Sequence, residues 1–101
     1  VHDNATDATR DVTLPGGKVV KVRGLTRYEL LMTGKGTEDV ALIERRNVAL
    51  CMVEPKMTEA QVEKWQKSSR PDSLGEVTRA IRDLSGLGEG AAKSDVAEVR
   101  D

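Results

Sequence analysis

The side chains that most often perform chemistry in proteins are sparse in this sequence and are not grouped. His2 is the only histidine and lies in a polar N-terminal stretch, so we expect neither histidine-based catalysis nor a zinc site in the fold. Cys51 is the only cysteine and lies in an apolar run, which favours a small buried hydrophobe. The sequence therefore predicts no catalytic, cofactor-binding or metal-binding residues, and we expect a protein that is not an enzyme.

Two glycine-containing segments superficially resemble functional motifs, but each lacks its essential neighbours. Gly16-Gly17 is not followed by the Gly-Lys-Ser/Thr of a phosphate-binding loop, and no helix is expected to begin there. Ser85-Gly86 lacks the Gly-x-Ser-x-Gly pattern of a nucleophile elbow. Both segments are better interpreted as turns.

Composition limits the kinds of partner and compartment. The chain has 101 residues, with 16 basic and 17 acidic side chains that are well mixed and give a formal net charge of −1. Such a balance provides no general attraction for nucleic acid or an anionic membrane surface. No apolar run approaches the ~20 residues that a membrane-spanning helix needs. The single cysteine is consistent with a reducing, cytoplasmic setting.

The N-terminal third predicts a β-hairpin followed by a short helix. Segments 12–14 and 19–23 flank Pro15-Gly16, which suits a type II turn, and the second segment alternates apolar and basic residues. Thr26 and Glu29 have capping-box spacing, which predicts a helix from Arg27 to Thr33 that ends at a left-handed Gly34. Within it, Leu30 and Leu31 are expected to face inward.

A central helix is predicted over 40–53, with Thr37 as its N-cap and Pro55 beyond its end. Its second half, residues 48–53, is apolar on every side, so other elements must enclose it. We therefore expect Leu50 to be a core residue. Arg45 and Arg46 interrupt the apolar pattern and are interpreted as a solvated patch, with partner binding as the alternative.

Two further helices follow. Thr58 and Gln61 form a second capping box, before a helix that runs to about residue 67 or 68 and whose narrow apolar stripe includes Trp65. Ser73 and Glu76 suggest a third capping box for an amphipathic helix that ends at Gly86 and whose core-facing residues include Ile81. Leu87 is placed to fold back on this glycine cap.

These elements predict one domain of mainly α (α+β) class, with about four to five short helices around a central buried helix and an N-terminal β-hairpin. Residues 1–11 are expected to form a flexible arm and residues 12–87 the globular domain. Residues 88–101 are weakly apolar and are expected to be a weakly ordered C-terminal helix or tail.

A small DNA-binding or regulatory domain is the alternative to a protein-binding function. The two helices between Thr58 and Leu84 superficially resemble a helix-turn-helix. Their predicted connection is longer than the usual turn, and the second helix carries Arg79 and Arg82 against Glu76 and Asp83. A DNA-reading helix normally shows a basic face, so this pattern does not favour nucleic acid.

The order of several motifs resembles the tail assembly chaperones of long-tailed (siphovirus-type) bacteriophages. The resemblance covers about residues 19–93 and depends on Arg23-Gly24, on Glu44 before a run of small apolar residues, on Pro55 with Thr58 and Trp65, and on 84–87, which read Leu-Ser-Gly-Leu. The resemblance implies a non-enzymatic protein that needs no cofactor.

Members of that family bind the tape-measure protein, help to recruit tail-tube subunits during tail morphogenesis and leave before the tail is complete. The resemblance thus implies a place in the cytoplasm of the infected bacterial host and absence from the mature virion. Homo-oligomers are possible partners, whereas nucleic acid and membranes are not expected. From residue type and predicted edge position, we expect partner contacts at Tyr28, Trp65 and Leu87.

Overall fold

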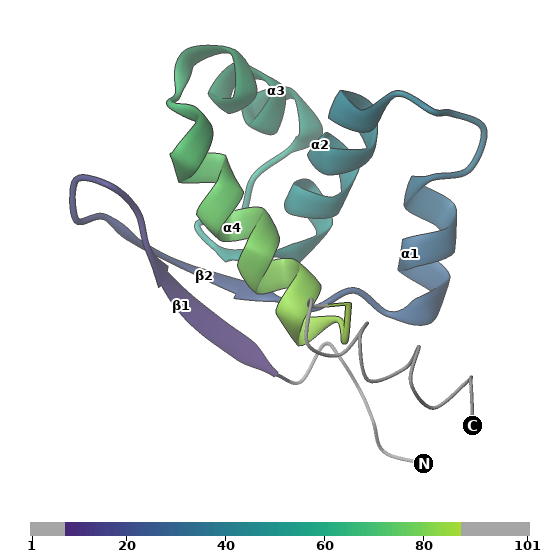
Figure 1. Ribbon diagram of the computed structural model, residues 1–101, viewed down its shortest axis with the longest axis horizontal. Coiled ribbons are helices and arrows are strands. Elements are labelled where there is room, and N and C mark those ends of the chain that lie inside the picture. Colours follow the sequence, from purple (N-terminus) through teal and green to yellow (C-terminus); the bar gives the residue numbers. More distant parts are fainter. Residues whose placement is uncertain (1–7, 88–101) are drawn as a thin grey trace, which may run out of the picture.

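The computed structural model describes residues 8–87, which form a three-stranded antiparallel sheet and four helices (Figure 1). In chain order the elements are β1 (Thr9–Thr13), β2 (Val19–Arg23), α1 (Arg27–Thr33), α2 (Val40–Cys51), β3 (Met52–Glu54), α3 (Glu59–Ser68) and α4 (Pro71–Leu84). The predicted α+β class, with several short helices and an N-terminal hairpin, is therefore confirmed.

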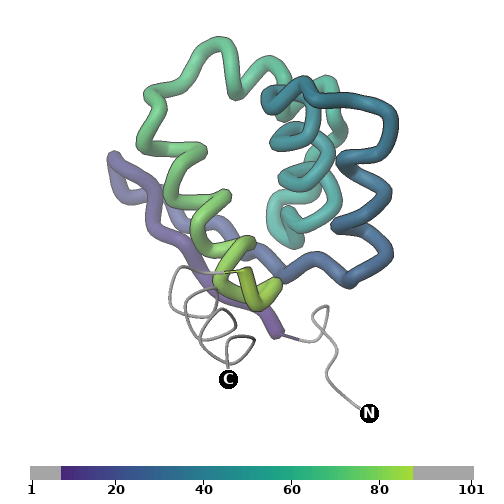
Figure 2. Tube along the Cα trace, turned by 45° about the vertical axis from the view of Figure 1, so that its right-hand side comes forward, coloured from purple at the N-terminus to yellow at the C-terminus, as the bar shows by residue number. Residues whose placement is uncertain are grey.

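The helices pack around α2 and on the hairpin. Helix α2 contacts α1, α3 and α4, and α4 also contacts β1 and β2. In both views α2 lies between α1 and α4, and α4 crosses the hairpin (Figure 1, Figure 2). Helix α1 is thus attached at one side of the molecule, mainly through α2.

The hairpin turn forms as the sequence predicts. Gly17 N–H donates to the Leu14 carbonyl at 2.9 Å, and Gly16 has a φ of 101°, the positive value that the third position of a type II turn requires. Strand β1 begins at Thr9, so Thr9–Asp11 belong to the sheet rather than to the expected arm. Their backbone pairs with β2 as far as Arg23, which extends the hairpin beyond its apolar residues. Of the rest of the arm, residues 1–7 lie outside the described residues, as does the expected tail, 88–101.

The predicted central helix is too long at its C-terminal end. Helix α2 ends at Cys51, and Met52–Glu54 form β3, which pairs antiparallel with β2 in the sheet order β1-β2-β3. Lys21 lies opposite Glu54 and Val22 opposite Met52, with a shift in register between the two pairs. Long-range pairing with β2 thus overrides the local helical pattern at this point.

Two of the three predicted capping boxes are present. Thr26 and Glu29 cap α1 reciprocally, and Thr58 and Gln61 do the same for α3. The third prediction is wrong, because α4 begins at Pro71, before Ser73, with Arg70 as an N-cap that makes no side-chain hydrogen bond. Proline lacks an N–H to satisfy and presets φ, so it starts a helix without a capping side chain.

The helix ends around two other loops also differ in part from expectation. The N-cap of α2 is Asp39, whose carboxylate accepts hydrogen bonds from the N–H groups of Ala41 and Leu42, whereas Thr37 only accepts from Asp39 N–H. Gly34 has a φ of −95°, so it is not left-handed. Gly36 has the positive φ, 76°, and turns the chain two residues later.

The C-terminal end of α4 follows the prediction. Gly86 has a φ of 78°, its N–H donates to the Asp83 carbonyl at 3.1 Å, and Leu87 N–H donates to the Arg82 carbonyl at 2.8 Å. These two bonds are the Schellman arrangement that satisfies the last carbonyls of a helix.

The core is aliphatic, as the composition requires. Its most enclosed side chains include Val22, Val48, Val62 and Val77, which come from the sheet and from three helices. The prediction that Leu50 is a core residue is wrong, because 40% of its surface is exposed. The fully buried residues of α2 are Val48 and Cys51. Next along the chain, Met52 of β3 also belongs to the core.

Candidate partner-binding site

The three predicted contact residues lie at different places. Tyr28 is on α1 and is 70% exposed. Trp65 is on α3 and is partly buried against the core. Leu87 follows α4 and is also partly buried. Trp65 and Leu87 line separate grooves, and Tyr28 lines neither, so the structure does not bring the three together into one site.

The outer side of α1 carries three large apolar residues that are exposed. Tyr28, Leu31 and Met32 have the i, i+3, i+4 spacing of one helix face and are 70%, 57% and 40% exposed. Val40, which begins α2, is 78% exposed. We call these four residues the α1 surface. The expectation that Leu31 faces inward is wrong. The leucine of α1 that packs against the core is Leu30, and Leu25, which precedes the helix, is buried there as well.

A groove lies beside the α1 surface, where α1, α2 and α4 meet. Its volume is about 280 Å³, and its apolar lining includes Leu30, Val40, Ile43 and Leu87. The Oδ1 atom of Asn47 also belongs to this region and is buried without a hydrogen-bond partner among the described residues. Val40 is both exposed and part of the lining, and Leu30 of α1 also lines the groove.

Trp65 lies in a second groove, of about 390 Å³, between the hairpin turn and the start of α3. We call it the Trp65 groove. Its lining comes from three separate segments: Leu14, Lys18 and Val20 of the hairpin, Pro55, Lys56 and Met57 of the loop after β3, and Gln61 and Trp65 of α3. The capping box of α3 fixes Gln61, whose Oε1 accepts from Thr58 N–H at 2.9 Å.

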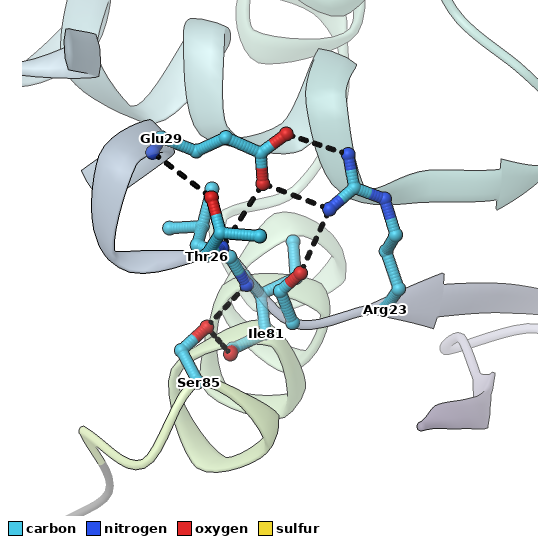
Figure 3. A network of polar contacts seen from close by, with 7 residues as sticks. Arg23, Thr26, Glu29, Ile81 and Ser85 are labelled. Carbon is cyan, nitrogen blue, oxygen red and sulfur yellow. Dashed lines mark hydrogen bonds and ion pairs between the residues drawn. The ribbon is translucent and has the colours of Figure 1, made fainter. Parts of the chain in front are cut away.

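A polar network holds α1 in place (Figure 3). The Arg23 guanidinium donates to both carboxylate oxygens of Glu29, at 2.9 and 3.0 Å, and also to the Gly24 carbonyl. The same carboxylate accepts from Thr26 N–H. The hydrogen bonds from Arg23 lower the pKa of Glu29 and, reciprocally, raise the pKa of Arg23, while partial burial opposes both changes.

The same network reaches α4. Leu25 N–H donates to Ser85 Oγ at 2.7 Å, and Ser85 Oγ donates to the Ile81 carbonyl at 2.6 Å (Figure 3). Two of the motifs behind the family resemblance, Arg23-Gly24 and Leu84–Leu87, therefore meet in space. Their contacts position α1 on the rest of the fold. This structural role explains the residues of both motifs, and no partner protein is needed to explain them.

Glu44, another residue of the resemblance, also has a structural role. Its Oε1 accepts from Gln66 Nε2 at 2.9 Å, and that nitrogen also donates to the Ala41 carbonyl. Arg45 donates to Gln66 Oε1 at 3.3 Å and forms an ion pair with Glu63 at 3.4 Å. The polar middle of α2 thus links α2 to α3. Arg45, which was expected to belong to a solvated patch, instead makes contacts with α3.

Arg46, the other residue of the expected solvated patch, also contacts another helix. Arg46 donates to the Thr33 carbonyl at 3.1 Å, which ties α2 to the end of α1. Satisfying a carbonyl at a helix C-terminus is a common role for a basic side chain. Arg46 is therefore better explained by the packing of α1 than by partner binding.

Two features of residues 8–87 bear on chemistry: the single cysteine and the grouping of possible metal ligands. Cys51 is buried, and burial raises the pKa of its thiol to about 12, so it is not an activated nucleophile. Within the same residues there is no group of three or more His, Cys, Asp and Glu side chains that could hold a metal ion. None of the four helices described is both long enough and apolar enough to cross a membrane.

The α3–α4 pair differs from the expected helix-loop-helix. Only Ser69 and Arg70 separate the two helices, so the connection is shorter, not longer, than a helix-turn-helix turn. Helix α4 turns Leu74, Val77, Ala80 and Ile81 into the core. Its exposed Arg79 lies 3.5 Å from Glu76, so basic and acidic groups interleave on the outer side.

Comparison of the whole chain with protein-family models, curated proteins and solved structures finds no match in any of the three.

Proposed function

We propose that this chain is a non-enzymatic tail assembly chaperone of a long-tailed bacteriophage. In this role it binds the tape-measure protein in the cytoplasm of the infected host, helps to recruit tail-tube subunits and is absent from the finished virion. The proposal starts from the motif order described above, and the observation that supports it best is the α1 surface.

The α1 surface suits an amphipathic helix as partner. A helix that lies in a groove presents apolar side chains at i, i+3, i+4 and i+7, and needs an apolar surface of similar spacing opposite. Tyr28, Leu31 and Met32 provide that spacing, and the neighbouring groove with Leu30 and Val40 provides a depression beside it. The family resemblance implies a long, helical and aggregation-prone tape-measure protein as this partner.

Co-expression tests the proposal. The chain would be produced with the tape-measure and tail-tube proteins encoded beside it, and the soluble tape-measure protein that co-elutes would be measured. We expect tape-measure protein to stay soluble and to co-elute only when this chain is present. Equal solubility with and without the chain, together with no co-elution, would sink the proposal.

Matched variants locate the surface. Leu31→Glu places a charge on the α1 surface, where the leucine is 57% exposed, and should weaken capture about tenfold or more, since few apolar anchors dominate such interfaces. Val19→Glu changes an equally exposed residue, 53%, on β2. Capture should survive this change. If both variants behave alike while their circular dichroism matches the parent chain, the α1 surface is not the binding site.

A further inference from the structure

The Trp65 groove has features that the α1 surface lacks. It combines a partly buried indole, a methionine and a proline with polar side chains. Its volume of about 390 Å³ lies near the lower end of the range of ligand-binding pockets, roughly 300–1,000 Å³. Lys18, Pro55, Lys56 and Gln61 are exposed, so the depression is open to solvent. An open groove fits a segment of polypeptide better than an enclosed small molecule.

The charge in the groove has one sign. Lys18 and Lys56 are the only ionisable residues in its lining, and neither forms an ion pair with an acidic side chain among residues 8–87. The two cations come from different segments, the hairpin turn and the loop after β3. Two like charges from separate segments therefore line the same apolar groove, and a segment that carries carboxylates would complement them.

The remaining side-chain polar groups of the groove include further donors. Gln61 Oε1 accepts from Thr58 N–H, and its amide nitrogen makes no hydrogen bond to another described residue. The Trp65 indole N–H makes no hydrogen bond to the described residues, and it is not among their buried unpartnered atoms. The side chains of the groove thus offer ammonium, amide and indole donors around an apolar floor.

From this geometry we propose that the Trp65 groove binds an acidic, aliphatic segment of another protein. One large aliphatic side chain enters between Trp65, Met57 and Leu14, and carboxylates on neighbouring residues of the segment reach Lys18 and Lys56. Carboxylates are acceptor-only groups and match the two ammonium donors of the lining. This site is separate from the α1 surface and does not depend on the function proposed above.

Trp65 is the only tryptophan, so its fluorescence reports this groove alone. Three synthetic peptides without aromatic residues serve as probes: a leucine-containing peptide with glutamates on both sides, its glutamine counterpart and its lysine counterpart. Each is titrated into the full-length chain. The acidic peptide should change Trp65 emission in a saturable way, more weakly as salt rises, and the lysine peptide should not bind.

Charge-reversal variants test the assignment of the two lysines. In the double variant Lys18→Glu with Lys56→Glu, affinity for the acidic peptide should fall about tenfold or more, and the lysine peptide should now bind. Lys35→Glu reverses an exposed lysine outside the groove and should leave binding of the acidic peptide unchanged. All three substituted residues are exposed, so the circular dichroism of each variant should match that of the parent chain.

Two results would overturn the inference. One is that acidic, neutral and basic peptides change Trp65 emission equally or not at all. The other is that Lys35→Glu weakens binding as much as the double variant, which would show a general charge effect. Tape-measure capture is measured separately, so loss of the α1-dependent function and loss of peptide binding are distinguishable.

Discussion

At Gly24 the end of β2 touches the last turn of α4 through backbone atoms alone. A Cβ at this position would lie 2.7 Å from the Leu84 carbonyl oxygen and 2.8 Å from its carbon. Neither atom belongs to a flexible side chain, so the contact can be relieved only by moving one element away from the other. The glycine is therefore required by the packing of the sheet against α4.

Gly24→Ala should destabilise the fold by about 1–3 kcal/mol, the usual cost of overpacking. The free energy of unfolding in urea would measure this. Gly34→Ala is the matched control, because Gly34 has a negative φ and no atom within 4 Å of an added Cβ. A Gly24→Ala variant as stable as Gly34→Ala would contradict the close approach.

The Arg23–Glu29 pair makes stability depend on acid pH. Because the folded-state pKa of Glu29 lies below its ordinary value of 4.5, the pair stabilises the fold fully above about pH 4.5 and loses this contribution as pH falls through the folded-state pKa. Glu29→Gln keeps an amide oxygen for the capping box, as Gln61 does in α3, but loses the charge. The variant should lower the free energy of unfolding by about 1 kcal/mol or less at neutral pH. Below pH ~4.5 its stability should decrease less steeply than that of the parent chain.

Urea unfolding between neutral and acid pH checks this expectation. Glu59→Gln is the control, because Glu59 occupies the first turn of α3 without an ion pair among the described residues. Parallel pH profiles for Glu29→Gln and the parent chain would show that Arg23 does not hold the Glu29 charge.

Among the elements, α2 and α4 differ in how they use their apolar residues. Ile81 of α4 is 2% exposed, whereas Leu50 of α2 is 40% exposed. Ile81→Ala should therefore cost about 2–5 kcal/mol, as buried aliphatic deletions do, and Leu50→Ala about 1 kcal/mol. Urea unfolding of the two variants gives the comparison. Equal costs would mean that the end of α2 is as enclosed as α4.

The start of α4 lacks a side chain that accepts a hydrogen bond from its first N–H groups. Serine is among the preferred N-cap residues, so Arg70→Ser should stabilise the fold by about 0.5–1 kcal/mol. Arg70→Ala is the control, since both changes remove the exposed ion pair with Asp72 and only serine adds a cap. Thermal unfolding should rank serine above alanine; the reverse order would show that the N-cap position is not at residue 70.

The elements that could be predicted are those whose signals are local. The capping boxes Thr26–Glu29 and Thr58–Gln61 each join residues three apart, so the sequence contains both partners of the interaction. Strand β3 was missed because its pairing depends on β2, some thirty residues earlier. The Ser73–Glu76 box failed because Pro71 starts α4 sooner.

At the scale of the whole molecule, the candidate surfaces depend on contacts between distant segments. Tyr28 and Trp65 could be singled out by residue type, but the Trp65 groove needs the hairpin turn to reach α3, and no local pattern predicts that. Leu31 was wrongly predicted to face inward, because in a helix as short as α1 the apolar spacing fits either side. Only the packing of α1 on α2 decides which side stays exposed.

Cys51 provides a test of how tightly the whole fold closes. It ends α2, and its side chain is buried in the core. Burial is the main reason that the pKa of its thiol rises to about 12, and the positive charge of Arg23 opposes this rise. Only the thiolate reacts readily with iodoacetamide. At pH 8 the native thiol should therefore be alkylated only when the chain opens.

The rate of Cys51 alkylation should rise with urea in parallel with the unfolded fraction, because the core opens as one unit. An added reference thiol, Ser68→Cys in a Cys51→Ala chain, lies on an exposed residue at the end of α3 and should react without urea. If Cys51 reacted as fast as this reference in the folded protein, α2 would separate from the sheet locally. The groove where α1, α2 and α4 meet would then open and close, rather than present a fixed surface to a partner.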